Sequence, residues 1–297
     1  MSGDLTVRHD PAQFRERNGQ DMSIVIGIDV GGSTTKIVGY REDRSFLAAL
    51  RVVAKDPVTS VYGALGRFIS ENRLQLGEVS HIVLTGVGAT HFEGDLYGIP
   101  TARVTEFEAI GKGGLELSGC DAAVVVSLGT GTAFVRATRT EGCSHIGGSG
   151  VGGGTLVALC SRLAQASSFD TVLQLAGKGD LGKIDLTIGD ISTADVGNMD
   201  KNVTAANFGK LADDAAPEDL VAGVENMVFQ TIGMMAIFAC RNCPIRDIVL
   251  TGTLTDLPGT RAIFDELEKL HDVNFIIPPN AVFATAVGAA LSYLDRA

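Results

Sequence analysis

The chain of 297 residues has no tryptophan, only 6% aromatic residues, and fewer basic than acidic side chains, with 24 Lys and Arg against 35 Asp and Glu. The formal net charge of −11 disfavours nucleic acid and anionic membranes as partners, because binding either requires clustered cations that displace counterions. The sequence also lacks an unbroken apolar run of about eighteen residues, the length of a membrane-spanning helix. We therefore expect a small-molecule ligand, with no nucleic-acid and no membrane partner.

Cysteine is scarce and scattered. The five cysteines are odd in number and lack the compact spacing of secreted disulfide proteins. Cys240 and Cys243 form a C-x-x-C, which could be a redox pair or half of a metal site. Without a second such motif or a nearby His, we interpret them as small apolar residues. Residues 1–22 are polar and charged, unlike a secretory signal, and are expected to be a flexible leader of a cytoplasmic protein.

One layout of strand, glycine turn and returning strand occurs twice in the chain. Ile24–Val30 is an apolar run that ends at Gly31-Gly32, and Ala122–Leu128 ends at Gly129-Thr130-Gly131. Strand and helix patterns alternate after each hairpin. The sequence therefore predicts two α/β domains, residues 23–119 and residues 120–297, with helical insertions in the second. Residues 177–202 are glycine-rich and polar, and are expected to form a loop that could be an oligomer contact or a lid.

The first glycine turn carries the chemistry of a phosphate site. Glycine lets backbone N–H groups approach phosphate oxygens where a Cβ would collide. Asp29 ends the strand and Lys36 follows the turn, so an anion for hydrated Mg²⁺ and a cation for phosphate lie close together. The turn is not a Walker A loop, because no helix follows it. A lone turn of this type can serve hairpin geometry alone, but the second hairpin and a later Thr251-Gly252-Thr253 favour phosphate binding.

This arrangement resembles the actin, hexokinase and Hsp70 ATPase superfamily, whose duplicated ribonuclease-H-like α/β domains enclose an interdomain ATP cleft. Within it the chain is similar to the type II (eukaryote-like) pantothenate kinases. The segments that carry the resemblance are Gly27–Lys36, Thr105–Ala109, Gly129–Thr132, Ile146–Thr155 and Val203–Gly209. The resemblance implies ATP-dependent phosphorylation of pantothenate to 4'-phosphopantothenate in coenzyme A biosynthesis, with ATP and Mg²⁺ as cofactors and a homodimer formed through a helix over about 219–239.

The resemblance also implies the roles of individual residues. Glu106 is the expected catalytic base and a substrate contact, since a weakly acidic alcohol must lose its proton as the O–P bond forms. Its neighbour Glu108 is the other candidate, and the family pattern favours Glu106. Asp29 is expected to hold Mg²⁺ through water. The expected nucleotide-binding residues are Asp29, Gly31, Gly32, Ser33, Thr34 and Lys36 of the first hairpin, Thr130 and Gly131 of the second, Gly153, Gly154 and Thr155 at a helix start, Phe169 against adenine, and Thr253.

His145 is the main departure from the family pattern, which carries an Arg there for the substrate carboxylate. A neutral His offers one donor where Arg offers a charged fork, so pantothenate specificity rests on whether His145, or the nearby Arg136 or Arg139, contacts the substrate. The same residue is compatible with an ordinary polar loop position.

Three other functions are compatible with parts of the sequence. A sugar or amino-sugar kinase of the same superfamily would be expected to use an Asp base, often beside a zinc-binding cluster that is not evident here. The activators of 2-hydroxyacyl-CoA dehydratases share a similar first turn, but their iron–sulfur cluster needs paired thiolates. A nucleotide-binding sensor without catalysis is the non-enzymatic alternative, and the joint presence of Asp29, Lys36 and Glu106 argues against it.

Overall fold

A computed structural model of the chain describes residues 6–8, 23–53, 56–193, 200–241 and 243–296. Its first sheet has the strand order β1-β4-β3-β2-β5-β6. Strands β2, β3 and β4 are antiparallel neighbours, while β5 and β6 run parallel to β2. The bounds are β1 Thr6–Arg8, β2 Ile24–Val30, β3 Thr34–Arg41, β4 Phe46–Val53, β5 Val79–Thr85 and β6 Thr101–Arg103.

The second sheet repeats this topology. Its order is β13-β12-β7-β8-β9, again an antiparallel meander joined to two parallel strands. The bounds are β7 Ala122–Leu128, β8 Thr132–Thr138, β9 Gly142–Ser149, β12 Asp247–Thr251 and β13 Asn274–Ile276. The predicted fold class, duplicated α/β domains of the actin/hexokinase type, is confirmed. The strand β9 was not predicted, because its residues are glycine-rich and mostly exposed and so lack an apolar pattern.

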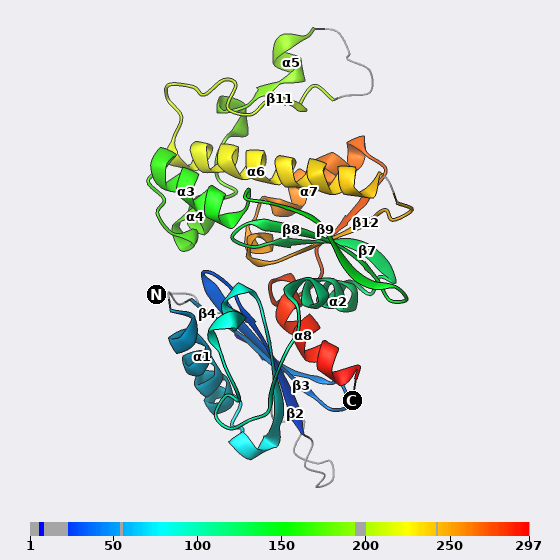
Figure 1. Ribbon diagram of the computed structural model, residues 1–297. Coiled ribbons are helices and arrows are strands. Elements are labelled where there is room, and N and C mark those ends of the chain that lie inside the picture. Colours follow the sequence, from blue (N-terminus) through cyan, green and yellow to red (C-terminus); the bar gives the residue numbers. More distant parts are fainter. Residues whose placement is uncertain (1–5, 9–22, 54–55, 194–199, 242, 297) are drawn as a thin grey trace.

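Helices cover both sheets, as Figure 1 shows. Helix α1 (Pro57–Glu71) packs Val61, Leu65 and Phe68 on the first sheet, and the Asp56 side chain caps it by accepting from Thr59 N–H at 2.6 Å. Over the second sheet lie α3 (Gly153–Leu163), α4 (Phe169–Leu175), α6 (Pro217–Cys240) and α7 (Thr260–Leu270). Short 3₁₀ turns follow β5 and β12, namely η3 (Val87–His91) and η5 (Thr253–Asp256).

Two helices join the halves by crossing between the sheets, α2 (Glu106–Ser118) and α8 (Ala284–Leu294) (Figure 1). Helix α2 follows the first sheet but packs on the second, and α8 follows the second but packs on the first. Gly113 and Gly288 lie at the crossing, where a Cβ on either would come within 1.7 Å or 1.8 Å of a backbone carbonyl oxygen of the other helix. The predicted boundary near residue 119 therefore separates the two sheets, but α2 and α8 each pack on the sheet of the other half.

The structure corrects two expectations about segments outside the sheets' cores. Within the expected leader, Thr6–Arg8 form β1 and pair with β4, while residues 1–5 and 9–22 lie outside the described residues. The expected loop over 177–202 contains η4 (Leu181–Lys183), β10 (Leu186–Thr187) and α5 (Ile188–Ile191), and residues 194–199 of it are not described. Strand β10 pairs with β11 (Thr204–Ala206), so this insertion has its own small sheet above α6 (Figure 1).

The motif Thr204–Gly209 belongs to this insertion and has a structural role. Asp185, 1% exposed, accepts hydrogen bonds from Asn207 Nδ2 at 3.1 Å, Phe208 N at 2.8 Å and Asn226 Nδ2 at 2.7 Å. The described residues give Asp185 no cationic partner, so these amides supply its stabilisation. The network ties the insertion to α6.

Helix α6 is long and apolar enough to cross a membrane by length and composition alone, but 61% of its most apolar window is buried. Its buried side chains, which include Val224, Val228, Phe229 and Ile232, belong to the core cluster of the second half. The helix is thus part of a protein core, and its apolar character has a packing explanation.

Glu225 on α6 gives a first testable prediction. It is 3% exposed, and its Oε1 has no hydrogen-bond partner among the described residues. Burial raises its pKa to about 7, while the Gly259 N–H lowers it in part. Since the folded-state pKa lies above the unfolded value, stability is full below about pH 4.5 and falls as pH rises toward 7, by about 3 kcal/mol in total. We expect Glu225→Gln to lack this loss and to be more stable than wild type at pH 8.

Urea unfolding at pH 5 and pH 8 measures this difference. Glu42→Gln, at an exposed turn residue, is the matched control and should keep the wild-type pH dependence. An equal drop in stability between the two pH values in wild type and Glu225→Gln would contradict the prediction.

Candidate active site

The first hairpin holds a buried ion pair next to its turn. Asp29 on β2 lies directly opposite Lys36 on β3, and Lys36 Nζ is 3.1 Å from Asp29 Oδ2. The two residues are 6% and 7% exposed. They lie on the same face of the sheet as Val25 and Val38. Those two valines pack against α8, whereas Asp29 and Lys36 lie past the N-terminal end of this helix. The predicted phosphate contact of Lys36 stays a prediction, because the structure shows the ammonium paired with Asp29.

Glu106 is the first residue of α2 and lies within electrostatic reach of this pair. Thr105 caps the helix by accepting from Glu108 N–H at 3.3 Å, which fixes the direction in which α2 starts. Burial, and after it the negative charge of Asp29, raises the pKa of Glu106, while Lys36 lowers it in part. A carboxylate with a raised pKa is a better-matched proton acceptor near neutral pH than an ordinary one. Its catalytic role stays a prediction.

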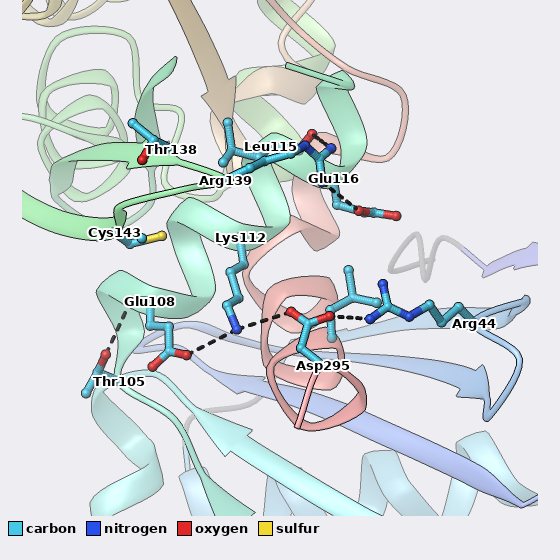
Figure 2. Close-up of a pocket in the computed structure, with 12 residues that line it drawn as sticks. Arg44, Thr105, Glu108, Lys112, Leu115, Glu116, Thr138, Arg139, Cys143 and Asp295 are labelled. Carbon is cyan, nitrogen blue, oxygen red and sulfur yellow. Dashed lines mark hydrogen bonds and ion pairs between the residues drawn. The ribbon is translucent and has the colours of Figure 1, made fainter. Parts of the chain in front are cut away.

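Glu108 points to a different place, which distinguishes it from Glu106. Its Oε1 is 3.3 Å from Lys112 Nζ and 3.2 Å from Arg296 Nη2. Glu108 lines a cavity of about 450 Å³. Figure 2 shows it there, with Lys112 also contacting Asp295 at the end of α8. Residues two apart on a helix point about 200° apart around its axis, which accounts for the separation. The acid with a perturbed pKa beside Asp29 is Glu106.

The two glycine turns, predicted to act together, lie against each other. A Cβ on Gly32 would be 3.6 Å from Thr130 Oγ1, so the first turn contacts the second across the gap between the sheets. Gly32, Ser33 and Thr130 are all exposed. Within each turn one amide is already used, Gly31 N–H to Thr34 O and Gly129 N–H to Gly131 O, both at 3.0 Å. The sequence prediction that both turns serve one site is compatible with this placement.

The glycine passage before α3 supports the second turn. Gly153 N–H donates to Gly129 O at 2.8 Å, and Gly154 N–H donates to Thr130 O at 2.9 Å. A Cβ on Gly152 would be 2.8 Å from the backbone of Gly131. The sequence predicted Gly153, Gly154 and Thr155 as direct nucleotide contacts. In the structure the amides of the two glycines bind the turn, and the Thr155 hydroxyl donates to Gly150 O at 2.8 Å, so the predicted nucleotide contacts stay predictions.

A turn that the sequence analysis missed lies directly beside Asp29. Gly86 follows β5 with a φ of 89°, and a Cβ there would be 2.7 Å from Asp29 Oδ1 and from Val30 O. Gly252 follows β12 with a φ of 93°, and a Cβ there would be 2.6 Å from Leu128 O. Both positions need glycine for conformation and for space. The signal was available in the sequence, since Thr85-Gly86 repeats the Thr251-Gly252 motif at the equivalent strand end.

The remaining predicted nucleotide contacts are Thr253 and Phe169. Thr253 begins η5 directly after Gly252 and is half-buried. Phe169 begins α4 and packs against the core of the second half. Neither position decides the predicted role, and both stay predictions.

His145 lies next to the residue that follows Glu106. Its imidazole stacks on the ring of Phe107, with centroids 4.0 Å apart and an angle of 15° between the planes. Both side chains are exposed. Arg139, the alternative substrate contact, pairs with Asp121 at 3.4 Å and reaches Leu115 O at 3.4 Å. Leu115 is nine residues along α2 from Glu106, or roughly 13 Å. Arg136 pairs with Glu141 near the β8–β9 turn, so His145 is the one of the three that contacts the start of α2, through Phe107.

The chain is similar to known proteins both in sequence and in fold. Residues 122–260 match the Fumble family profile. The chain is 29% identical over 277 residues to a type II pantothenate kinase of Oceanobacillus iheyensis, covering 90% of this chain and 98% of that protein. Among solved structures, the Acidaminococcus fermentans (R)-2-hydroxyglutaryl-CoA dehydratase component A matches with a TM-score of 0.67 at 17% identity, covering 92% and 98% of the two chains. A ROK family glucokinase of Streptomyces griseus, in complex with glucose and AMPPNP, matches with a TM-score of 0.59 at 13% identity over 91% and 99%.

The duplicated sheets, crossed helices and facing glycine turns give this chain the fold of the actin/hexokinase-type ATPases. In sequence the chain is similar to the type II pantothenate kinases, and the resemblance recognised in its motifs is confirmed.

The likeness to the dehydratase component shows the fold alone, at 17% identity. A cluster ligand must be a thiolate. In this chain burial raises the pKa of Cys160 to about 12 and that of Cys240 to about 11, and it also raises the pKa of Cys143. With no metal bound, these thiols are therefore protonated at neutral pH, as expected of buried apolar cysteines. Cys240 is buried and Cys243 half-buried, in agreement with the apolar interpretation of the C-x-x-C.

Proposed function

We propose that this protein is an ATP-dependent pantothenate kinase, which forms 4'-phosphopantothenate and ADP. The similarity to type II pantothenate kinases over nine-tenths of the chain supports pantothenate as the phosphate acceptor. The observation that carries the mechanism is the position of Glu106, which begins α2 beside the Asp29–Lys36 pair and has a raised pKa. Phosphoryl transfer needs little covalent chemistry from a protein, so positioning and charge account for most of its catalysis.

In the proposed reaction the Glu106 carboxylate accepts the proton of the acceptor hydroxyl as the O–P bond forms. The glycine turns at Gly31-Gly32 and Thr130-Gly131 position the ATP phosphates. Asp29 orients Lys36 through their 3.1 Å contact and provides negative charge beside Glu106. The raised pKa means that Glu106 must lose a proton before it can act, so the acid limb of kcat/KM should lie above the pH range of an ordinary carboxyl.

Magnesium is part of the proposal, and the donor set fits it. Asp29 offers one carboxylate at the site, and the described residues form no cluster of three or more His, Cys, Asp or Glu that could hold a metal. Mg²⁺ usually keeps several waters and binds through one or two carboxylates together with the substrate phosphates. Asp29 would hold such an ion through water, and the ion would neutralise charge on the phosphates.

A coupled assay of ADP release, with Mg-ATP and with pantothenate, pantetheine and common sugars as separate acceptors, tests the proposal. Turnover on pantothenate is the expected result. Turnover on a sugar alone would support the other kinase function, and ATP binding without turnover on any acceptor would support the sensor.

His145 is proposed to contact the acceptor. Stacking on Phe107 occupies one face of its imidazole and leaves the ring nitrogens at the exposed edge. We expect His145→Ala to raise KM for pantothenate about 10-fold or more, with a smaller change in kcat and none in KM for ATP. His145→Arg should bind a carboxylate at least as well, because its charged fork can be bidentate. Arg136→Ala, in the same hairpin, is the control. A KM for pantothenate that is equal in His145→Ala and wild type would remove His145 from the site.

A cytoplasmic homodimer completes the proposal. On the outer face of α6, Phe238 is 51% exposed and Met234 and Met235 are half-buried, which supplies an apolar surface for a second copy. Light scattering coupled to gel filtration measures the mass directly, and Phe238→Glu should shift it toward the monomer.

A further inference from the structure

An ion pair joins the two halves of the molecule on the side of the glycine turns. Arg51 on β4 of the first sheet meets Asp256 at the end of η5 in the second half, with Arg51 Nη1 2.7 Å from Asp256 Oδ2. The side chains are only 11% and 26% exposed. A pair this sheltered is screened less by salt than a surface pair, and loss of one partner leaves the other charge poorly solvated.

Arg51 extends the row of charges that contains Asp29. It lies directly opposite Lys36 in the β3–β4 ladder, and Lys36 lies directly opposite Asp29 in the β2–β3 ladder. Residues directly opposite in antiparallel strands point to the same face, so Asp29, Lys36 and Arg51 share one face of the first sheet. Across the sheet the row contains one carboxylate, Asp29, followed by two cations, Lys36 and Arg51. Asp256 of the second half adds a second carboxylate next to Arg51.

Asp256 belongs to a turn with internal restraints, so its position and that of Thr253 are linked. Thr255 Oγ1 donates to Gly252 O at 2.7 Å, and Thr260 Oγ1 donates to Leu254 O at 3.0 Å. The turn begins at Gly252, whose lack of a Cβ lets it lie against Leu128 at the end of β7. The same short segment therefore touches Arg51 at one end and the strand before the second glycine turn at the other.

We propose that Arg51 and Asp256 are positioning residues for nucleotide binding. Their ion pair holds the Thr253 turn at a fixed place relative to the Asp29–Lys36 pair, so that the nucleoside and phosphate parts of one nucleotide can be bound at once. The pair also gives Arg51 a carboxylate other than that of Asp29, so that Asp29 stays paired with Lys36. This inference rests on the ATP-binding part of the proposed function and is independent of the acceptor.

A charge-reversal cycle tests the pair: Arg51→Asp, Asp256→Arg, and the two combined. Binding of the non-hydrolysable analogue AMPPNP with Mg²⁺ to the full chain is measured by calorimetry without acceptor. Each single variant should weaken binding about 10- to 100-fold, and the combined variant should recover to within about 5-fold of wild type, because the opposite charges are restored in exchanged places. Arg136→Glu and Glu141→Arg, an exposed pair within one hairpin, are the controls and should change binding less than about 2-fold.

Circular dichroism and thermal unfolding establish that each variant is folded. Where a reversal prevents folding, the neutral variants Arg51→Gln and Asp256→Asn replace it, and their losses should not add, because either change alone already removes the ion pair. Single variants that bind like wild type, or a combined variant as weak as the sum of the two single losses, would overturn the proposal. Wild-type protein that fails to bind AMPPNP would instead contradict the proposed kinase function.

Discussion

Glu106→Gln should lower kcat for phosphoryl transfer about 100- to 10,000-fold and leave the affinity for ATP unchanged. A positioned general base contributes a rate factor of about this size, and glutamine keeps the shape of the side chain without its basicity. Because burial raises the pKa of Glu106, the ionised carboxylate is unfavourable in the folded state, so the amide should fold at least as well. Loss of activity could then be attributed to chemistry.

Glu108→Gln is the matched control, since it makes the same chemical change two residues along the same helix. Its carboxylate pairs with Lys112 and Arg296 in the cavity of Figure 2, so activity should stay within about 3-fold of wild type. The measurement is steady-state kinetics in the ADP-release assay, together with AMPPNP binding. Full activity in Glu106→Gln, or a greater loss in Glu108→Gln, would refute the assignment of the base.

Gly113→Ala should cause the largest loss of stability. A Cβ there would lie 1.7 Å from Ala284 O and 2.6 Å from its carbonyl carbon, so α2 and α8 could not keep their crossing. Overpacking against backbone costs about 3 kcal/mol or more, and no flexible side chain is present to move away. Since α2 carries Glu106 at its first residue, activity should fall as well.

Gly66→Ala on α1 makes the same substitution where nothing lies within 4 Å of the new methyl group. It should raise stability by about 0.4 to 1 kcal/mol, because alanine loses less backbone entropy in a helix. Urea unfolding of the two variants should therefore shift in opposite directions. A Gly113→Ala protein with the wild-type midpoint would mean that the two helices are not in backbone contact.

Several parts of the site could be predicted because their signals are local. The hairpin at Asp29–Lys36 follows from an apolar run and a glycine pair, and its partner at Gly129–Thr132 repeats the pattern. The start of α2 at Glu106 follows from Thr105, because threonine is a preferred N-cap residue and its side chain accepts a hydrogen bond from the first turn of the helix. These features depend on neighbours within a few residues, and the fold class followed from their repetition.

Other features of the site depend on how helices and strands that are far apart in the chain pack together. In the sequence Glu106 and Glu108 are two residues apart. Only the packing of α2 decides that Glu106 lies near Asp29 and that Glu108 lies in a cavity with Lys112. The strand β9 has no apolar pattern of its own and forms because β8 offers a paired edge. The Thr85-Gly86 motif marks a turn in the sequence, but only the structure shows that Gly86 lies against Asp29, which is far away in the chain.

The sequence by itself therefore determined the two glycine turns and the duplicated α/β class, because short-range patterns specify strands, turns and helix starts, and it predicted the roles of Asp29, Lys36 and Glu106. Only the tertiary structure decided that Lys36 is held by Asp29, that α2 and α8 exchange sheets, and that Arg51 meets Asp256. Contacts between residues far apart in the chain leave no periodic signal in sequence, since they arise from the sum of many packing free energies.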